Sequence, residues 1–137
     1  MKNDCIFCAI CEGEIPSFKV YEDEYVLAYL DINPCSKGHT LVIPKVHSAG
    51  LLDTSDEMLA VIISRVRKVA AHLKMVLPCD GFNILQNNGE AAGQTVNHVH
   101  FHIVPRYSGT DSVGVGFESK SADMAELAAL AEKVRIS

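Results

Sequence analysis

The sequence lacks an apolar run long enough to cross a bilayer. Its longest clearly apolar stretch, residues 58–63, is far shorter than the roughly 20 residues that a membrane-spanning helix needs. The N-terminal residues 1–4 include Lys2 and Asp4, and no apolar stretch follows them, so no secretory signal is visible. We therefore expect a protein that does not enter a membrane and that resides in the cytoplasm, where cysteines remain reduced.

An excess of positive charge is also absent. The chain has 12 Lys and Arg residues against 17 Asp and Glu residues, a formal net charge of −5. Proteins that bind nucleic acids rely on Lys and Arg to neutralise many phosphates, so this balance argues against a nucleic-acid partner. It leaves open small phosphorylated ligands, which backbone N–H groups, histidines and a few local cations can hold.

Internal repeats, linkers and low-complexity segments are lacking as well. The 137 residues suit one domain, which we expect to span residues 1–137. A hydrophobic content of 48% and a charged content of 21% are ordinary for a globular protein and argue against disorder.

Short β-prone runs predict a sheet. Residues 19–22 and 26–30 are separated by the acidic turn Asp23-Glu24, which favours an antiparallel hairpin. Further strands are expected over residues 39–43, 82–86 and 96–104, and the last of these alternates strongly between apolar and polar residues.

Apolar residues spaced three and four apart between Leu59 and Val76 predict one long helix. Thr54 and Glu57 fit a capping box at its start, and Pro78 with Gly81 marks its end. A C-terminal helix is expected from about residue 122 to 134. Because the strands do not alternate regularly with helices, we expect an α+β fold with a five-stranded antiparallel sheet, one long helix and one C-terminal helix.

Three histidines occupy alternate positions in the expected fifth strand. His98, His100 and His102 would share one face of that strand, with apolar residues on the other. A solvated sheet face, a metal site and a catalytic site for phosphoryl or nucleotidyl transfer all agree with this spacing. Spacing alone does not decide among them.

Two cysteines near the N-terminus, Cys5 and Cys8, have the Cys-x-x-Cys spacing that lets both thiolates bind one metal. A redox pair and a merely buried pair are the alternatives. Redox motifs of this kind normally accompany βαβ organisation, which this sequence lacks.

Residues 97–106, NHVHFHIVPR, follow Gly93-Gln94-Thr95 and strongly resemble the signature of the histidine triad family of nucleotide hydrolases and transferases. Other segments that resemble family landmarks occur in the same order, namely residues 5–8, 13–16, 29–31, 38–45 and 87–90. The resemblance covers roughly residues 5 to 107 and implies the fold of that family.

The resemblance implies unequal roles for the histidines. His100 would attack the α-phosphorus of a nucleotide and form a transient nucleotidyl-imidazole, while its other ring N–H is held by an acceptor such as the backbone carbonyl of His98. His102 would stabilise charge on the non-bridging oxygens or the leaving group. His39 would lie close to this cluster.

The nucleotide-binding residues are also implied by the resemblance. Asp31 would accept hydrogen bonds from the ribose hydroxyls, and Tyr29 and Ile32 would wall the base. The phosphate-binding part of the family pattern corresponds to Asn87, Gly93, Gln94 and Thr95. Without the resemblance, Asp31 would be interpreted as a turn or strand-end residue and the Asn/Gly stretch as an ordinary loop.

Many bacterial relatives in this family hold a zinc ion with such a cysteine pair and two histidines. The matching positions here are His47 and His98, so the resemblance implies a structural zinc site formed by Cys5, Cys8, His47 and His98. Cys11 continues the spacing but is not part of the family pattern. We expect Cys35 and Cys79 to be buried thiols or loop residues.

The expected function is hydrolysis of purine nucleoside phosphoramidates, or related adenylylated substrates, to the nucleoside monophosphate. Residues Gln94-Thr95 and Pro105-Arg106 resemble those of dinucleoside polyphosphate hydrolases, which is the alternative. A nucleotide-binding interaction protein with incidental hydrolysis and a metal-dependent hydrolase are further alternatives.

The resemblance also implies a homodimer, because family members pair through the long helix and an edge strand. In this chain we expect the contacts at residues 82–86 and at the helix face that carries Ile62, Val66 and Val69.

Overall fold

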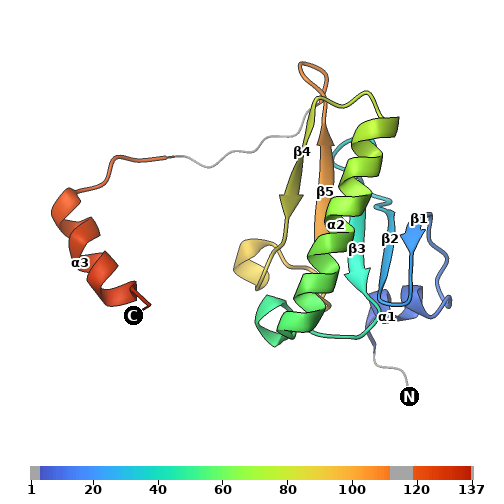
Figure 1. Cartoon of the computed structure of the whole chain (residues 1–137), viewed down its shortest axis with the longest axis horizontal. Helices are drawn as coiled ribbons and strands as arrows, with labels where there is room; N and C mark the ends of the chain where they lie inside the picture. Colours follow the sequence, from blue (N-terminus) through green and yellow to red (C-terminus); the bar gives the residue numbers. More distant parts are fainter. Residues whose placement is uncertain (1–3, 112–118, 137) are drawn as a thin grey trace.

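The computed structural model describes residues 4–111 and 119–136, and within them the expected α+β fold is confirmed (Figure 1). Five strands, β1 (Lys19–Glu22), β2 (Val26–Leu30), β3 (Thr40–Pro44), β4 (Gly81–Leu85) and β5 (Phe101–Arg106), form one antiparallel sheet in the order β1-β2-β3-β5-β4. The helices are α1 (Ile6–Cys11), α2 (Asp56–Val76) and α3 (Met124–Val134). Short 3₁₀ turns span Leu51–Asp53 and Glu90–Ala92.

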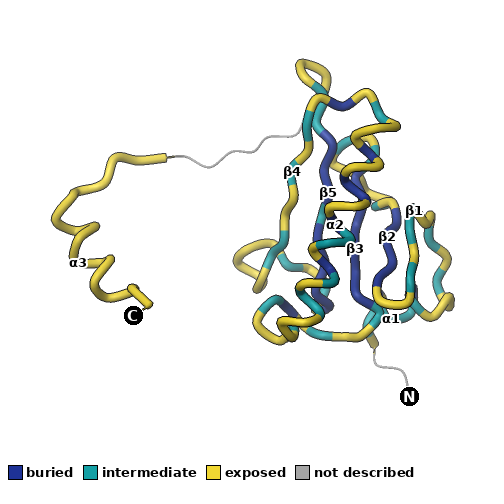
Figure 2. Tube along the Cα trace, in the orientation of Figure 1, coloured by how far each residue is buried: buried dark blue, intermediate teal, exposed yellow. Residues whose placement is uncertain are grey.

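The two faces of the sheet are covered by different helices. Alternation along β2 directs Val26 and Ala28 into the cluster formed with α2, whereas Leu27 and Tyr29 join the cluster that contains Phe7 of α1. The central strands are consequently buried, as Figure 2 shows. In β5, Phe101 and Ile103 join the cluster formed with α2, which leaves His102 on the α1 face.

Helix α2 begins one residue later than the predicted capping box allows. Ser55 is the N-cap, and its hydroxyl accepts a hydrogen bond from the backbone N–H of Met58. The hydroxyl of Thr54 instead donates to the backbone carbonyl of Gly50, so it holds the preceding turn together. The capping box at Thr54 and Glu57 was therefore wrong, although the helix itself was predicted.

Strand β5 is shorter at its start than the predicted 96–104 segment and runs from Phe101 to Arg106. Its pairing with β3 ends at Val42 and Phe101, and its pairing with β4 ends at Leu85 and His102. Before that point the backbone pairs elsewhere, since the N–H of Val99 donates to the carbonyl of Ser48. His98 and His100 therefore precede the strand, and only His102 lies within it.

The predicted dimer face of α2 is also wrong. Ile62, Val66 and Val69 are at most 2% exposed because they pack against the sheet of their own chain. They cannot contact a second copy without unfolding this core. Edge strand β4, the other predicted contact, keeps Phe82 and Ile84 exposed.

The ends of the chain contribute two helices of different kinds. Helix α1, which no sequence pattern predicted, carries Phe7 and Ile10 into the core. The expected C-terminal helix is present as α3, and all of its described residues are exposed (Figure 2). Among the described residues, no helix has the length and apolar character needed to span a membrane.

Candidate active site and metal cluster

A pocket of about 430 Å³ lies on the α1 face of the sheet. Apolar side chains of α1, of the segment before β1 and of β2 and β3 form most of its wall. His100, His102, Asp31 and Thr95 also line it. A mainly apolar cavity with a few polar groups is typical of small-molecule sites.

His100 is buried, and the hydrogen-bond partner of its ring determines which nitrogen carries the proton. Its Nδ1 atom lies 2.6 Å from the backbone carbonyl oxygen of His98. Because a carbonyl only accepts, Nδ1 carries the proton and donates, and the neutral ring keeps a lone pair on Nε2. This is the acceptor that the family resemblance implied, and it prepares Nε2 to act as a nucleophile.

His39 and His102 are joined by a hydrogen bond between their rings. The backbone N–H of Cys35 donates to Nδ1 of His39 over 3.1 Å, so the neutral His39 ring carries its proton on Nε2. That Nε2 atom lies 2.9 Å from Nδ1 of His102 and donates to it. The proton of His102 is therefore on Nε2, where it can be donated to a bound ligand.

Both rings of this pair are neutral at pH 7. Burial, and then the nearby His100 and His39, lower the pKa of His102 to about 4. Burial also lowers the pKa of His39, against the opposing effect of the Asp31 carboxylate, whose Oδ2 lies 3.7 Å from His39 Nε2. His39 and His102 therefore act as hydrogen-bonding groups rather than as cations.

Besides His100 and His102, the structure brings four more of the predicted nucleotide-binding residues to the pocket: Tyr29, Asp31, Ile32 and Thr95. The Asp31 carboxylate is oriented by the backbone N–H of Asn33, which donates to Oδ1 over 2.8 Å. Tyr29 is buried in the wall, and among the described residues its hydroxyl has no hydrogen-bond partner. Ile32 is 77% exposed and lies at the rim.

The other predicted phosphate-binding residues do not line the pocket but shape the loop before it. The side chain of Gln94 donates to the backbone carbonyl of Ala49 over 2.7 Å and also contacts two backbone groups of its own loop. Gly93 has a φ of +94°, a left-handed conformation that favours glycine, and a Cβ there would meet Nδ2 of Asn87. Together these contacts position Thr95 at the pocket.

Arg106, which the sequence analysis associated with dinucleoside polyphosphates, is engaged in structural contacts. Its guanidinium donates to Asp111 over 3.0 Å and to Oδ1 of Asn83 over 2.9 Å. Arg106 holds the end of β5 to the following turn and is not among the residues that line the pocket.

Cys5, Cys8, His47 and His98 converge in a second cluster. Nδ1 of His98 lies 3.3 Å from Cys5 Sγ, 3.6 Å from Cys8 Sγ and 3.2 Å from His47 Nδ1. The other nitrogen of His98 lies 2.8 Å from the backbone carbonyl oxygen of Pro44, so it carries the proton and leaves Nδ1 as an acceptor.

These distances agree with a tetrahedral metal site. Metal–sulfur bonds of about 2.3 Å and metal–nitrogen bonds of about 2.0 Å give tetrahedron edges of roughly 3.3–3.8 Å. The Cys8 Sγ to His47 Nδ1 distance of 3.3 Å also lies in this range. Two thiolates and two imidazoles with one nitrogen each directed inward are a donor set suited to zinc.

Cys11 does not belong to the cluster, although it continues the cysteine spacing. Its thiol approaches the backbone carbonyl of Pro44, and burial followed by the nearby Cys8 raises its pKa to about 11. It is therefore a neutral thiol at pH 7. Cys79 is buried, as expected, and Cys35 is exposed in the loop before β3.

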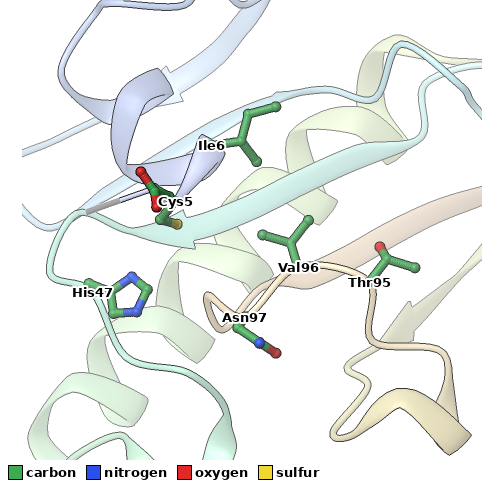
Figure 3. A pocket seen from close by; sticks show the side chains of 7 residues that line it. Cys5, Ile6, His47, Thr95, Val96 and Asn97 are labelled. Atoms are coloured by element: carbon green, nitrogen blue, oxygen red, sulfur yellow. The ribbon is translucent and has the colours of Figure 1, made fainter. Parts of the chain in front are cut away.

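A second pocket of about 440 Å³ lies beside the metal-ligand cluster (Figure 3). Cys5 and His47 lie at one end, and Thr95 lies at the other. Because Ile6, Thr95 and Val96 line both pockets, the cluster and the histidine pocket share a wall.

Two elements of the site were missed by sequence reasoning. The backbone N–H of Cys35 determines the tautomer of His39, and no sequence pattern indicates such a contact. Phe7 packs against the histidines, and its position between the two cysteines was the available signal.

Known proteins are similar to this chain over most of its length. An uncharacterized HIT-like protein of Methanocaldococcus jannaschii is 54% identical over 123 residues, which cover 90% of this chain and 95% of that protein. A Schizosaccharomyces pombe protein named adenosine 5'-monophosphoramidase is 47% identical, with 95% of each chain covered.

Two solved structures extend the comparison to the fold. A Streptococcus mutans protein has a TM-score of 0.93 at 47% identity and covers 98% of this chain and 85% of its own. A zinc-bound histidine triad family protein of Mycobacterium smegmatis has a TM-score of 0.77 at 41% identity, with 95% of each chain covered. A family model described as the HIT domain matches residues 12–109. The chain therefore belongs to the HIT domain family.

Proposed function

We propose that this protein hydrolyses purine nucleoside phosphoramidates, or related adenylylated substrates, to the nucleoside monophosphate through a nucleotidyl intermediate on His100. The observation that carries the proposal is the hydrogen bond from His100 Nδ1 to the carbonyl of His98, which leaves the Nε2 lone pair for attack on phosphorus. The relative named as a monophosphoramidase supports the same chemistry.

The proposed reaction has two displacements at phosphorus. In the first, a bond forms between His100 Nε2 and the α-phosphorus while the bond to the leaving nitrogen breaks. In the second, a water oxygen replaces His100 and regenerates the ring. Overall, one hydrogen of the water ends on the released amine and the hydroxyl on the phosphate.

The neighbouring groups have distinct proposed roles in this reaction. The Nε2–H of His102 donates to a phosphoryl oxygen or to the leaving atom, because His39 holds the opposite nitrogen as an acceptor. Asp31 accepts hydrogen bonds from the ribose, while Tyr29 and Ile32 contact the base. Thr95 contacts the phosphate, and the loop from Asn87 through Gly93 and Gln94 holds Thr95 at the pocket.

The test of the function is turnover of an adenosine phosphoramidate by His100→Asn. This change keeps polarity and removes the nucleophile, so turnover should fall by ~10⁴ or more while nucleotide binding persists. Label from an adenylyl donor should map to His100 in the wild type under quenching without acid. Label on another residue, or near-normal turnover of the variant, would refute the assignment.

A parallel assay with a diadenosine polyphosphate separates the proposed substrate class from its alternative. The engagement of Gln94 and Arg106 in structural contacts favours the phosphoramidate. Nucleotide binding without turnover of either substrate would instead indicate a binding protein. Complete abolition of turnover by a chelator, at unchanged folding, would indicate metal-dependent hydrolysis, whereas an enzyme whose zinc is structural should keep part of its turnover.

We also propose that Cys5, Cys8, His47 and His98 bind one structural zinc ion per chain. When bound, the zinc would connect the N-terminal segment to the segment before β5. Its support is the match between the cluster distances and tetrahedral edges.

Elemental analysis of protein purified without added metal tests the zinc proposal. The double variant Cys5→Ala/Cys8→Ala should lose the zinc and have a lower Tm than the wild type, because zinc that binds only the folded state stabilises it. Cys11→Ala is the matched control from the same helix and should keep the zinc. Unchanged zinc content in the double variant would overturn the proposal.

We further propose a homodimer that pairs through β4. The strand lies at the edge of the sheet and exposes Phe82, Ile84 and Leu85. An edge strand with exposed apolar side chains is suited to pairing with a second copy. The buried α2 residues named in the sequence analysis take no part in this contact.

A further inference from the structure

Phe7 lies between two ligands of the metal-ligand cluster and also contacts the proposed nucleophile. It follows Cys5 and precedes Cys8, and its side chain is 7% exposed. Its ring centroid is 5.0 Å from that of His100 at an interplanar angle of 88°, and 5.8 Å from that of His98 at 73°. One aromatic side chain therefore connects the cluster to the active site.

The orientation of the His100 ring depends on the side chains packed around it. Its hydrogen bond to the carbonyl of His98 anchors Nδ1, but the broad χ2 torsion of histidine still lets the ring turn through a range of angles. Perpendicular packing of Phe7 restricts that turn on one side, and His102 lies on another with a centroid distance of 5.1 Å. Because nucleophilic attack depends on the direction of the Nε2 lone pair, this packing affects the reaction directly.

The position of Phe7 depends in turn on the cluster. Helix α1 has only six residues, too few for a helix that is stable by itself. Its first turn is held by Cys5, whose sulfur accepts a hydrogen bond from the backbone N–H of Cys8. A metal bound by both sulfurs would hold this turn against His98, whose backbone also anchors His100.

We infer that Phe7 is a positioning residue for His100 and that it transmits occupancy of the Cys5–Cys8–His47–His98 cluster to the nucleophile. The inference rests on the proposed nucleotidyl-His100 chemistry and deepens it. The metal takes no part in bond making, and its effect reaches phosphorus only through the orientation of the His100 ring.

The first experiment compares Phe7→Leu with the wild type in the zinc-loaded state. The rate of nucleotidyl-His100 formation in a single turnover should fall roughly 10- to 100-fold, because small misplacements of a reacting group have effects of this size. The dissociation constant for the nucleoside monophosphate should change less than threefold and the zinc content should stay the same. In proteins with labelled histidine, NMR relaxation should show increased motion of the His100 ring.

The matched control is Cys11→Ala, a change on the same helix at a residue that lines neither pocket and lies outside the metal-ligand cluster. It should keep the His100 relaxation and the rate of adduct formation of the wild type. If Cys11→Ala slows adduct formation and loosens the His100 ring as much as Phe7→Leu does, the effect comes from α1 in general and the inference fails.

The second experiment removes the zinc from both proteins with a chelator. In the wild type, chelation should slow adduct formation and increase the motion of the His100 ring. In Phe7→Leu, chelation should change these two quantities little further, because the Phe7 ring that connects the cluster to His100 is already missing. Equal effects of chelation in both proteins would overturn the inference. If Phe7→Leu does not fold, an unchanged His100 relaxation signal in chelated, folded wild type would overturn it.

These outcomes are distinguishable from failure of the proposed function. If His100 forms no nucleotidyl adduct in the wild type, the proposed function itself is wrong. If the adduct forms and is insensitive to Phe7 and to chelation, only the positioning role is wrong.

Discussion

The histidines around the pocket differ in the group that forms a hydrogen bond with one of their two ring nitrogens. A backbone carbonyl accepts from His100 and another from His98, whereas a backbone N–H donates to His39. His102 takes its tautomer from His39. In its neutral form each ring therefore presents a defined donor or acceptor, and backbone groups supply this order at little entropic cost.

The lowered pKa of His102 predicts a loss of stability in mild acid. Its folded value of about 4 lies below the ordinary 6.5, so between these values the unfolded chain binds a proton that the folded chain does not. The contribution of His102 to the free energy of unfolding is therefore complete above pH 6.5 and is lost as the pH falls toward 4. By linkage the free energy of unfolding should fall by about 2 kcal/mol from this group between pH 7.5 and pH 5.

Denaturant unfolding at several pH values, compared with His102→Gln, measures this contribution. The variant should show a shallower decline than the wild type. The control is His72→Gln, which replaces an exposed histidine on α2. Its free energy of unfolding should fall with pH as steeply as that of the wild type. Equal slopes for the wild type and His102→Gln, or an NMR titration of His102 near pH 6.5, would contradict the assignment.

At the scale of elements, α2 shows how a local rule can select the wrong residue. Ser and Thr are both good N-caps, and two of them stand side by side at positions 54 and 55. The loop contact of Thr54 with Gly50 leaves the cap to Ser55. Asp56 and Glu57 in the first turn then interact favourably with the positive end of the helix.

Ser55→Ala should lower the free energy of unfolding by about 1 kcal/mol, because the N–H of Met58 loses its acceptor. Thermal and denaturant unfolding of the metal-loaded protein measure the effect. Ser64→Ala makes the same substitution inside the same helix and should stay within about 0.5 kcal/mol, since alanine is the better helix former. Similar losses in both variants would mean that Ser55 does not cap α2.

At the scale of the whole molecule, the sheet has two unlike edges. β1 contributes one edge, and β4 contributes the other with three exposed large apolar side chains. The α2 face that carries Ile62, Val66 and Val69 packs against its own sheet, and the proposed pairing uses β4 instead. A single-domain organisation and a cytoplasmic location remain predictions.

Replacing Ile84 with Lys on β4 should shift the mass at micromolar concentration from that of a dimer to that of a monomer, because the charge would be buried in the pairing. Sedimentation velocity measures this shift. Phe18→Lys, at the β1 side of the sheet, changes a residue that is 68% exposed and should leave the mass unaltered. A monomeric wild type would rule out the proposed dimer.

Local pattern was sufficient for much of this protein. The 3.6-residue periodicity identified α2, β-prone runs identified four strands within one residue of their bounds, and motif order identified the family. The family resemblance then grouped the cysteine and histidine residues that the structure brings together in one cluster. The elements and the family motifs were accessible because each depends on residue types at fixed spacing along the chain.

The tertiary structure alone decided how those residues are oriented. His39 and His102 are 63 positions apart, and the proton between them is assigned by a backbone N–H of Cys35 that no side-chain pattern reports. The start of β5 depends on where its neighbouring strands stop, and the role of Phe7 depends on which rings it meets. Sequence periodicity determines which face of an element is apolar, whereas the contact between distant loops follows only from packing the elements together.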